Sequence, residues 1–130
     1  MSYWDERLNV SILLGKTLVK IEKSDREIIF TDKDNNKYKM YHEQDCCEDV
    51  RIEDIIGDLD DLLFAPLLMA EEVKSHENPL DYIVSEYGQD SFTWTFYKFA
   101  TIKGYVTIRW YGESNGYYSE SVDFIKLEDN

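Results

Sequence analysis

The first third of the chain alternates apolar and polar positions with the period of two that is typical of β-strands. Turn-forming serine, aspartate and asparagine residues divide this part into three runs, which cover residues 18–23, 26–32 and 37–43. In the third run, Tyr38, Met40 and His42 share one face and lysines occupy the other. The pattern predicts a three-stranded meander with a lysine-rich exposed face.

The last third repeats this kind of pattern with more aromatic residues. Three runs rich in β-branched and aromatic side chains cover residues 91–102, 104–113 and 117–128. Lys103-Gly104 and Asn115-Gly116 separate them, and Asn-Gly is a strong hairpin signal. We therefore expect a C-terminal hairpin sheet, in which Trp94 and Trp110 are neighbours across the ladder.

The middle of the chain is ambiguous between strand and helix. Asp45-x-x-Glu48 has the form of a capping box, and Asp58 can cap a second short segment. In that segment a buried side is expected to consist of Leu59, Leu62, Leu63 and Phe64. Pro66 ends it, and residues 67–73 then read as a strand. The middle therefore predicts a short helical acidic insert.

These elements predict an α+β fold that is mostly antiparallel sheet: an N-terminal meander, a short helical acidic insert and a C-terminal hairpin sheet. A chain of 130 residues is long enough to bury one core, so we expect a single domain over residues 1–130. No apolar run reaches membrane-spanning length, and the first residues lack the features of an export signal. A cytoplasmic protein without a membrane partner is the expectation.

The net charge of −13 has one source. Residues 43–90 carry fifteen acidic residues against two bases, Arg51 and Lys74. Such a block repels nucleic acids and anionic membranes and attracts basic surfaces. It also serves simply to keep a protein in solution. We expect no direct nucleic-acid binding.

The stretch YHEQDCCE, residues 41–48, concentrates the candidate chemistry. The chain offers four soft metal ligands in all: His42, Cys46, Cys47 and His76. Adjacent cysteines seldom bind one zinc ion together, and the carboxylates around them oppose a reactive thiolate. A vicinal disulfide is a further alternative. We favour a structural interpretation, in which one cysteine packs as a small apolar residue while Gln44 and Asp45 bond to backbone groups. No metal and no cofactor are expected.

Three segments of the sequence are distinctive: residues 41–63, the AEE of residues 70–72, and residues 94–122. The QDCCE core, the IEDI–GDLDDL run and the RWYGESNGYYSE hairpin within them carry a resemblance to a family of small uncharacterised proteins found largely in bacteriophages and prophages. The resemblance spans residues 41–122 with gaps. The family has no assigned activity. The resemblance therefore implies a setting, the cytoplasm of a bacterial host, and carries over no catalytic residues.

We expect a non-catalytic protein-binding module, an inhibitor or modifier of a host factor being one form, with imitation of nucleic-acid charge as a further hypothesis. Its partner would be a host protein with a basic surface. The candidate interaction surface comprises Asp58, Asp60, Asp61, Glu71, Glu72, Tyr111, Tyr117 and Tyr118. One alternative is a metal-binding or hydrolytic protein that uses His42, Cys46 and nearby carboxylates. Another is a homo-oligomeric structural component of a phage.

Overall fold

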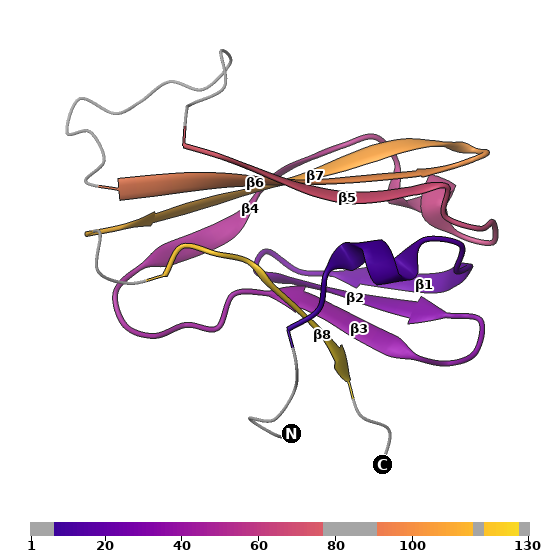
Figure 1. Cartoon of the computed structure of the whole chain (residues 1–130), viewed down its shortest axis with the longest axis horizontal. Coiled ribbons are helices and arrows are strands. Elements are labelled where there is room, and N and C mark those ends of the chain that lie inside the picture. The colour runs from indigo at the N-terminus through magenta and orange to yellow at the C-terminus, as the bar shows by residue number, and fades with distance from the viewer. Residues whose placement is uncertain (1–6, 77–90, 116–118, 128–130) are drawn as a thin grey trace.

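The chain folds as a β-sandwich of two antiparallel sheets with four strands each (Figure 1). The computed structural model describes residues 7–76, 91–115 and 119–127. One sheet has the order β1-β2-β3-β8, with bounds Leu18–Lys23, Glu27–Asp32, Lys37–Tyr41 and Asp123–Leu127. The other has the order β4-β7-β6-β5, with bounds Asp49–Ile56, Gly104–Ser114, Ser91–Thr101 and Met69–Ser75. Two short 3-10 helices accompany them, η1 (Val10–Leu13) and η2 (Leu59–Leu62).

The predicted N-terminal meander is confirmed. Strands β1, β2 and β3 pair in sequence order, and Tyr38 and Met40 are buried while Lys37 is exposed. The turn between β2 and β3 is built around Asp32, whose carboxylate accepts from the backbone N–H groups of Asp34 and Asn36, each at 2.9 Å. The buried Tyr38 and Met40 and the exposed Lys37 show that the alternation of apolar and polar residues determines which face of β3 lies on the core.

Of the three predicted C-terminal runs, the first two are confirmed as strands, and the third is a strand only over Asp123–Leu127, with residues 119–122 outside it and a different partner. Strands β6 and β7 form a long hairpin that closes at the pair Thr101 and Gly104. Strand β8 does not continue this hairpin sheet. It crosses to the other sheet and pairs with β3, where Phe124 lies opposite Met40. The first sheet therefore contains strands from both ends of the chain, and the second sheet contains the strands between them.

The expected Trp94–Trp110 contact across the ladder does not form. Trp94 lies opposite Tyr111, with ring centroids 4.7 Å apart, and Trp110 lies opposite Thr95. The register places the two tryptophans on opposite faces of the sheet, since successive side chains of a strand alternate. Trp110 faces the core, and its indole N–H donates to Sδ of Met40 at 3.3 Å.

The core lies between the sheets and draws on both. Phe30 and Met40 of the first sheet and Phe99, Ile108 and Trp110 of the second are all fully buried in one hydrophobic cluster. Phe30 contacts Phe99 directly across the interface, with ring centroids 5.8 Å apart. Burial of large apolar side chains from both layers is what holds a sandwich together.

The α+β assignment with a helical acidic insert is wrong. Residues 49–56 form strand β4, and η2 is a single 3-10 turn; no α-helix occurs in the described ranges 7–76, 91–115 and 119–127. Asp58 does cap this turn, because its Oδ1 accepts from the N–H of Asp60 at 2.9 Å. Gly57 ends β4 with φ +110°, a conformation that favours glycine. Residues 67–73 largely coincide with β5, as predicted.

Among the described residues, no helix has the length and apolarity needed to span a membrane.

Candidate functional site

One end of the sandwich carries large apolar side chains on its surface. It is formed by the β6–β7 turn, by η2 and the segment after it, and by the connection from η1 to β1 (Figure 1). Backbone bonds hold these parts together: Leu68 N–H donates to Ala100 O at 2.8 Å, and Gly15 N–H donates to Leu67 O at 2.8 Å. We call this region the hairpin-end surface; its members are Leu14, Asp58, Asp60, Asp61, Phe64, Leu68 and Ile102.

The apolar members of this surface are among the most exposed apolar residues described. Their exposed fractions are 55% for Leu14, 68% for Phe64, 65% for Leu68 and 86% for Ile102. The ring of Phe64 lies 5.7 Å from Nζ of Lys103, which places the η2 segment beside the hairpin turn. An exposed apolar group with a polar border is typical of a surface that binds another protein.

Phe64 has an unusual backbone conformation. Its φ is 64°, and with Asn35 it is one of two non-glycine residues with positive φ among those described. Asparagine adopts this conformation readily, whereas a bulky side chain is strained in it. The expectation that Phe64 belongs to a buried side is wrong, since its side chain projects to solvent while Leu62 is fully buried.

The candidate residues predicted from the sequence do not form one surface. Asp58 caps η2, and Asp60 and Asp61 lie in its first turn. Glu71 and Glu72 lie on β5, an edge strand, and Glu72 accepts from the phenol of buried Tyr97 at 2.7 Å. These two groups of carboxylates are therefore separate.

The predicted tyrosine tip is not supported by the one member that is described. Tyr111 is 0% exposed and packs on Trp94, so its side chain is not available to a partner. Tyr117 and Tyr118 lie outside the described residues.

Part of the acidic block is neutralised within the fold. Glu53 accepts from Nε of Arg109 at 2.7 Å, and Arg109 also lies over the ring of Trp94. Asp49 pairs with Arg26 at 2.9 Å and with Arg51. The carboxylates of residues 43–76 thus do not make one continuous anionic face, and η2 is where three of them remain together.

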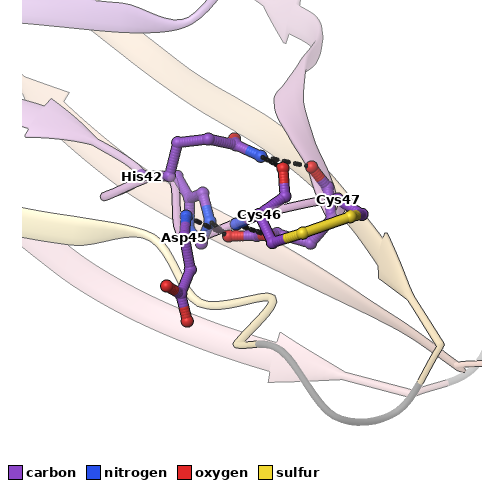
Figure 2. Close-up of a disulfide and its surroundings, with 6 residues drawn as sticks. His42, Asp45, Cys46 and Cys47 are labelled. Carbon is purple, nitrogen blue, oxygen red and sulfur yellow. Dashed lines mark hydrogen bonds and ion pairs between the residues drawn. A yellow bond between two sulfur atoms is a disulfide. The ribbon is translucent and has the colours of Figure 1, made fainter.

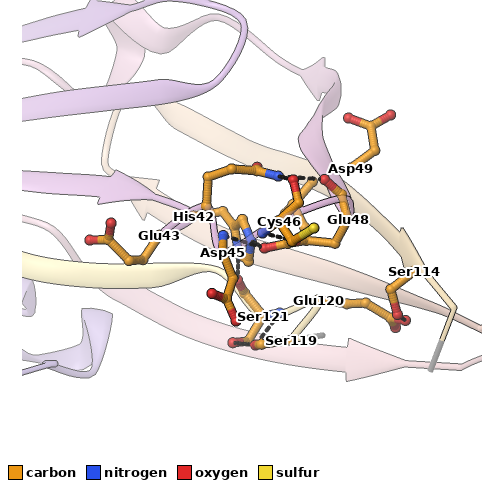
Figure 3. Close-up of polar contacts among 12 residues, drawn as sticks. His42, Glu43, Asp45, Cys46, Glu48, Asp49, Ser114, Ser119, Glu120 and Ser121 are labelled. Carbon is orange, nitrogen blue, oxygen red and sulfur yellow. Dashed lines mark hydrogen bonds and ion pairs between the residues drawn. The ribbon is translucent and has the colours of Figure 1, made fainter. Parts of the chain in front are cut away.

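The opposite end of the sandwich contains a buried pair, His42 and Glu48 (Figure 3). Their side chains are 5% and 0% exposed, and Nε2 of His42 lies 2.7 Å from Oε2 of Glu48. Nδ1 of His42 lies 2.7 Å from the carbonyl oxygen of Ser121. Each ring nitrogen of His42 therefore faces a hydrogen-bond acceptor, a carboxylate on one side and a carbonyl on the other.

Glu48 is also held by the backbone of its own loop. Its Oε1 accepts from Cys46 N–H at 2.9 Å, and its Oε2 accepts from Asp45 N–H at 2.8 Å. Burial raises the pKa of Glu48, but the bonds from His42 and from these N–H groups outweigh it and lower the pKa to about 2. The side chain of Glu48 therefore reaches back to Asp45 as in a capping box, although no helix follows.

Cys46 and Cys47 form a vicinal disulfide (Figure 2). Both residues are exposed, so the prediction that one of them packs as a small apolar residue is wrong. The predicted role of Gln44 is confirmed: its side-chain N–H group donates to the carbonyl oxygens of Cys46 and Glu48 at 3.1 and 2.8 Å. Asp45 bonds through its backbone instead.

These contacts fasten two crossings between the sheets. The chain passes from β3 to β4 through residues 42–48 and from β7 to β8 through the segment that contains Ser121. His42 joins the two crossings, and Glu120 ties the second to β6 and β7 by accepting from Thr93 at 2.8 Å and Ser114 at 2.5 Å. His42 and Glu120 thus have a structural role, which is to hold the two crossings in place.

A shallow cavity of about 410 Å³ adjoins this site and is lined by Arg26, His42, Gln44, Glu48, Asp49 and Val50. Within the described part of the chain, no group of three or more His, Cys, Asp or Glu residues is placed to hold a metal ion. His76 lies past the end of β5, with Nδ1 3.4 Å from the carbonyl oxygen of Phe92. His76 thus lies beside β6, whereas His42, Cys46 and Cys47 lie in the β3–β4 loop.

A protein-family model described as "Domain of unknown function (DUF7448)" matches residues 11–124. The chain belongs to this family. The match includes strands β1 to β7, the first two residues of β8, and both 3-10 turns except Val10. The hairpin-end surface and the His42–Glu48 pair lie entirely within it. The search of curated proteins and the search of solved structures each found no match.

The sequence patterns did not predict the exposed apolar members of the hairpin-end surface. Ile102 could have indicated this surface, because it lies in a two-residue hairpin turn, where polar residues and glycine are usual. Phe64 offered no such signal, since an apolar residue after Leu62 and Leu63 reads as part of a buried run.

Proposed function

We propose that the protein is a non-catalytic protein-binding module that docks through its hairpin-end surface on a host protein with a basic surface. The observation that carries this proposal is the group of exposed apolar side chains beside the three carboxylates of η2. Folding alone gives no reason to expose Phe64, Leu68 and Ile102 at one end of a small domain. A bacteriophage or prophage setting, which the resemblance of residues 41–122 implies, belongs to the same proposal.

The distribution of the other groups supports binding over catalysis. Both ring nitrogens of His42 are engaged, and Cys46 and Cys47 are bonded to each other. A general base or a thiolate nucleophile needs a free nitrogen or a free sulfur. We therefore do not propose the metal-binding or hydrolytic alternative. Nor do we propose imitation of nucleic-acid charge, because the carboxylates are divided between separate places.

The test is affinity capture from a bacterial host lysate at low and at high salt, with the recovered protein then purified and its affinity measured directly. We expect a basic partner whose binding weakens as salt rises, because exposed charges are screened. We expect the variant in which Phe64 and Ile102 are both replaced by serine to lose the partner. Val73→Thr, on β5, should retain it. Recovery of no partner at low salt would count against the proposed function.

A further inference from the structure

We propose that Phe64 is the anchor of the hairpin-end surface, a side chain that inserts into an apolar pocket of the partner protein, with lysine or arginine side chains on the rim of that pocket. This role rests on the proposed function, to which it adds a residue and the chemistry of the partner's surface.

The first argument is conformational. With φ at 64° and 68% of its side chain exposed, Phe64 combines a strained backbone with little burial in return. Glycine adopts this backbone conformation without strain, and a polar residue suits the exposure better. Folding therefore gives no reason for phenylalanine here, whereas insertion into a partner's pocket uses its large apolar area.

The second argument is rigidity. The segment that presents Phe64 is fixed on both sides of it: Phe64 N–H donates to Leu18 O at 2.8 Å, and Leu67 N–H donates to Lys16 O at 2.9 Å. Pro66 restricts the same segment further. A side chain on an ordered backbone loses less conformational entropy on binding than one on a mobile loop.

The third argument concerns charge. Asp58, Asp60 and Asp61 lie within one turn of chain just before Phe64, and Nζ of Lys103 is a cation beside the same ring. A partner that carries carboxylates at this border is disfavoured, and one that carries cations gains. The occupant is therefore a basic foreign protein.

The experiment uses the whole chain and three short synthetic peptides: one of leucine and lysine, one of serine and lysine, and one of leucine and glutamate. We expect the leucine–lysine peptide to bind more tightly than the other two, with amide chemical-shift changes concentrated in residues 58–68 and 100–104. Similar affinity for the serine–lysine peptide would overturn the proposal, because charge alone would then account for binding.

Three variants separate the anchor from the fold. Phe64→Gly should weaken binding of the leucine–lysine peptide about tenfold or more, the loss expected for a central interface residue. Its thermal midpoint should stay within about 4 °C of the wild type, since removal of strain offsets the added freedom of the unfolded chain. Asn35→Gly, at the other described non-glycine residue with positive φ, and Val73→Thr, at an exposed valine on β5, should leave binding unchanged.

The outcomes distinguish the two proposals. Capture of a partner that Phe64→Gly binds as tightly as the wild type would overturn the anchor and leave the proposed function standing. Self-association of the wild-type chain that Phe64→Gly abolishes would assign the surface to a second copy and overturn the foreign partner. Binding of the leucine–lysine peptide with shifts centred on residues 42–48 would place the site at the wrong end.

Discussion

Nε2 of His42 lies 2.7 Å from Oε2 of Glu48, a buried contact within the loop that leaves the first sheet between β3 and β4. The other ring nitrogen, Nδ1, lies 2.7 Å from the carbonyl oxygen of Ser121, so His42 connects this loop to the segment that returns to the first sheet at β8. A sandwich whose strands exchange between sheets needs its crossings fixed, and this pair does so at the end opposite the β6–β7 turn. The two ends of the molecule thus have different roles, one architectural and one proposed for binding.

The first prediction concerns acid. The folded pKa of Glu48, about 2, is below that of a free glutamate, so its ionised form stabilises the fold above the unfolded pKa of about 4.3. This stability is lost as pH falls from about 4.3 towards 2. Glu48→Gln should therefore be less stable at neutral pH and show a smaller loss over that window, measured by urea unfolding at each pH.

Glu43→Gln is the matched control for the acid prediction. Glu43 is an exposed carboxylate of the same loop, and it accepts from the phenol of Tyr41 at 3.1 Å. It should keep the pH dependence of the wild type between about 4.3 and 2. An unchanged slope in Glu48→Gln would mean that this carboxylate does not supply the acid sensitivity.

The second prediction is that the disulfide contributes little to stability. Cys46 and Cys47 are adjacent, so their bond closes almost no loop and removes little entropy from the unfolded chain. Replacement of both by serine should change the free energy of unfolding by about 1 kcal/mol or less. Thermal unfolding of the wild type with and without reductant should agree with this, and the double variant should not respond to reductant. A large destabilisation in either experiment would contradict the prediction.

The third prediction compares two glycines. A Cβ at Gly112 would lie 2.7 Å from the backbone oxygen of Glu120, which cannot move without shifting the β7–β8 crossing. Gly112→Ala should therefore destabilise by about 1–3 kcal/mol. The three atoms nearest to a Cβ at Gly104 all belong to the side chain of Asp61, and the closest, Oδ2 at 2.5 Å, can rotate away. In chemical denaturation, Gly112→Ala should have a lower free energy of unfolding than Gly104→Ala. The reverse order would contradict the described β7–β8 crossing.

The fourth prediction concerns Tyr97, which is fully buried and donates to Glu72 at 2.7 Å. Burial, and then the charge of Glu72, raise the pKa of Tyr97 above its ordinary value of 10. The stability that this gives is full below pH 10 and is lost as pH rises beyond it. Tyr97→Phe should cost about 1.5–3 kcal/mol at neutral pH, the range for a bond to a charged acceptor, and its free energy of unfolding should fall less than that of the wild type above pH 10.

The exposed Tyr105 provides the control for this prediction. Its side chain is 52% exposed, so Tyr105→Phe should leave the free energy of unfolding nearly unchanged at neutral pH. Equal effects of the two substitutions on urea unfolding would show that the Tyr97–Glu72 bond does not contribute to stability.

Local patterns in the sequence predict most strands, because alternation and turn residues act over a few positions. They do not predict the partner of β8, since pairing with β3 depends on residues about 80 positions away and the Asn-Gly signal favours the nearer strand. The segment around Ile52 shows a related limit, because short apolar runs fit both strand and helix until a neighbouring strand selects one.

The site was less predictable than the fold. The Asp45-x-x-Glu48 spacing did predict a contact, since Glu48 bonds to the N–H of Asp45, but not the buried histidine beside it. Surface patches join residues distant in sequence, as Phe64 and Ile102 do here, so periodicity within one segment cannot reveal them.

The central claim is that the protein binds a basic partner through the hairpin-end surface. Amide hydrogen exchange, measured on the chain alone and with the partner recovered at low salt, tests it most directly. We predict added protection in residues 58–68 and 100–104, and its loss when Phe64→Gly replaces the wild type. Protection confined to residues 42–48 and 119–121, at the opposite end of the sandwich, would contradict the claim.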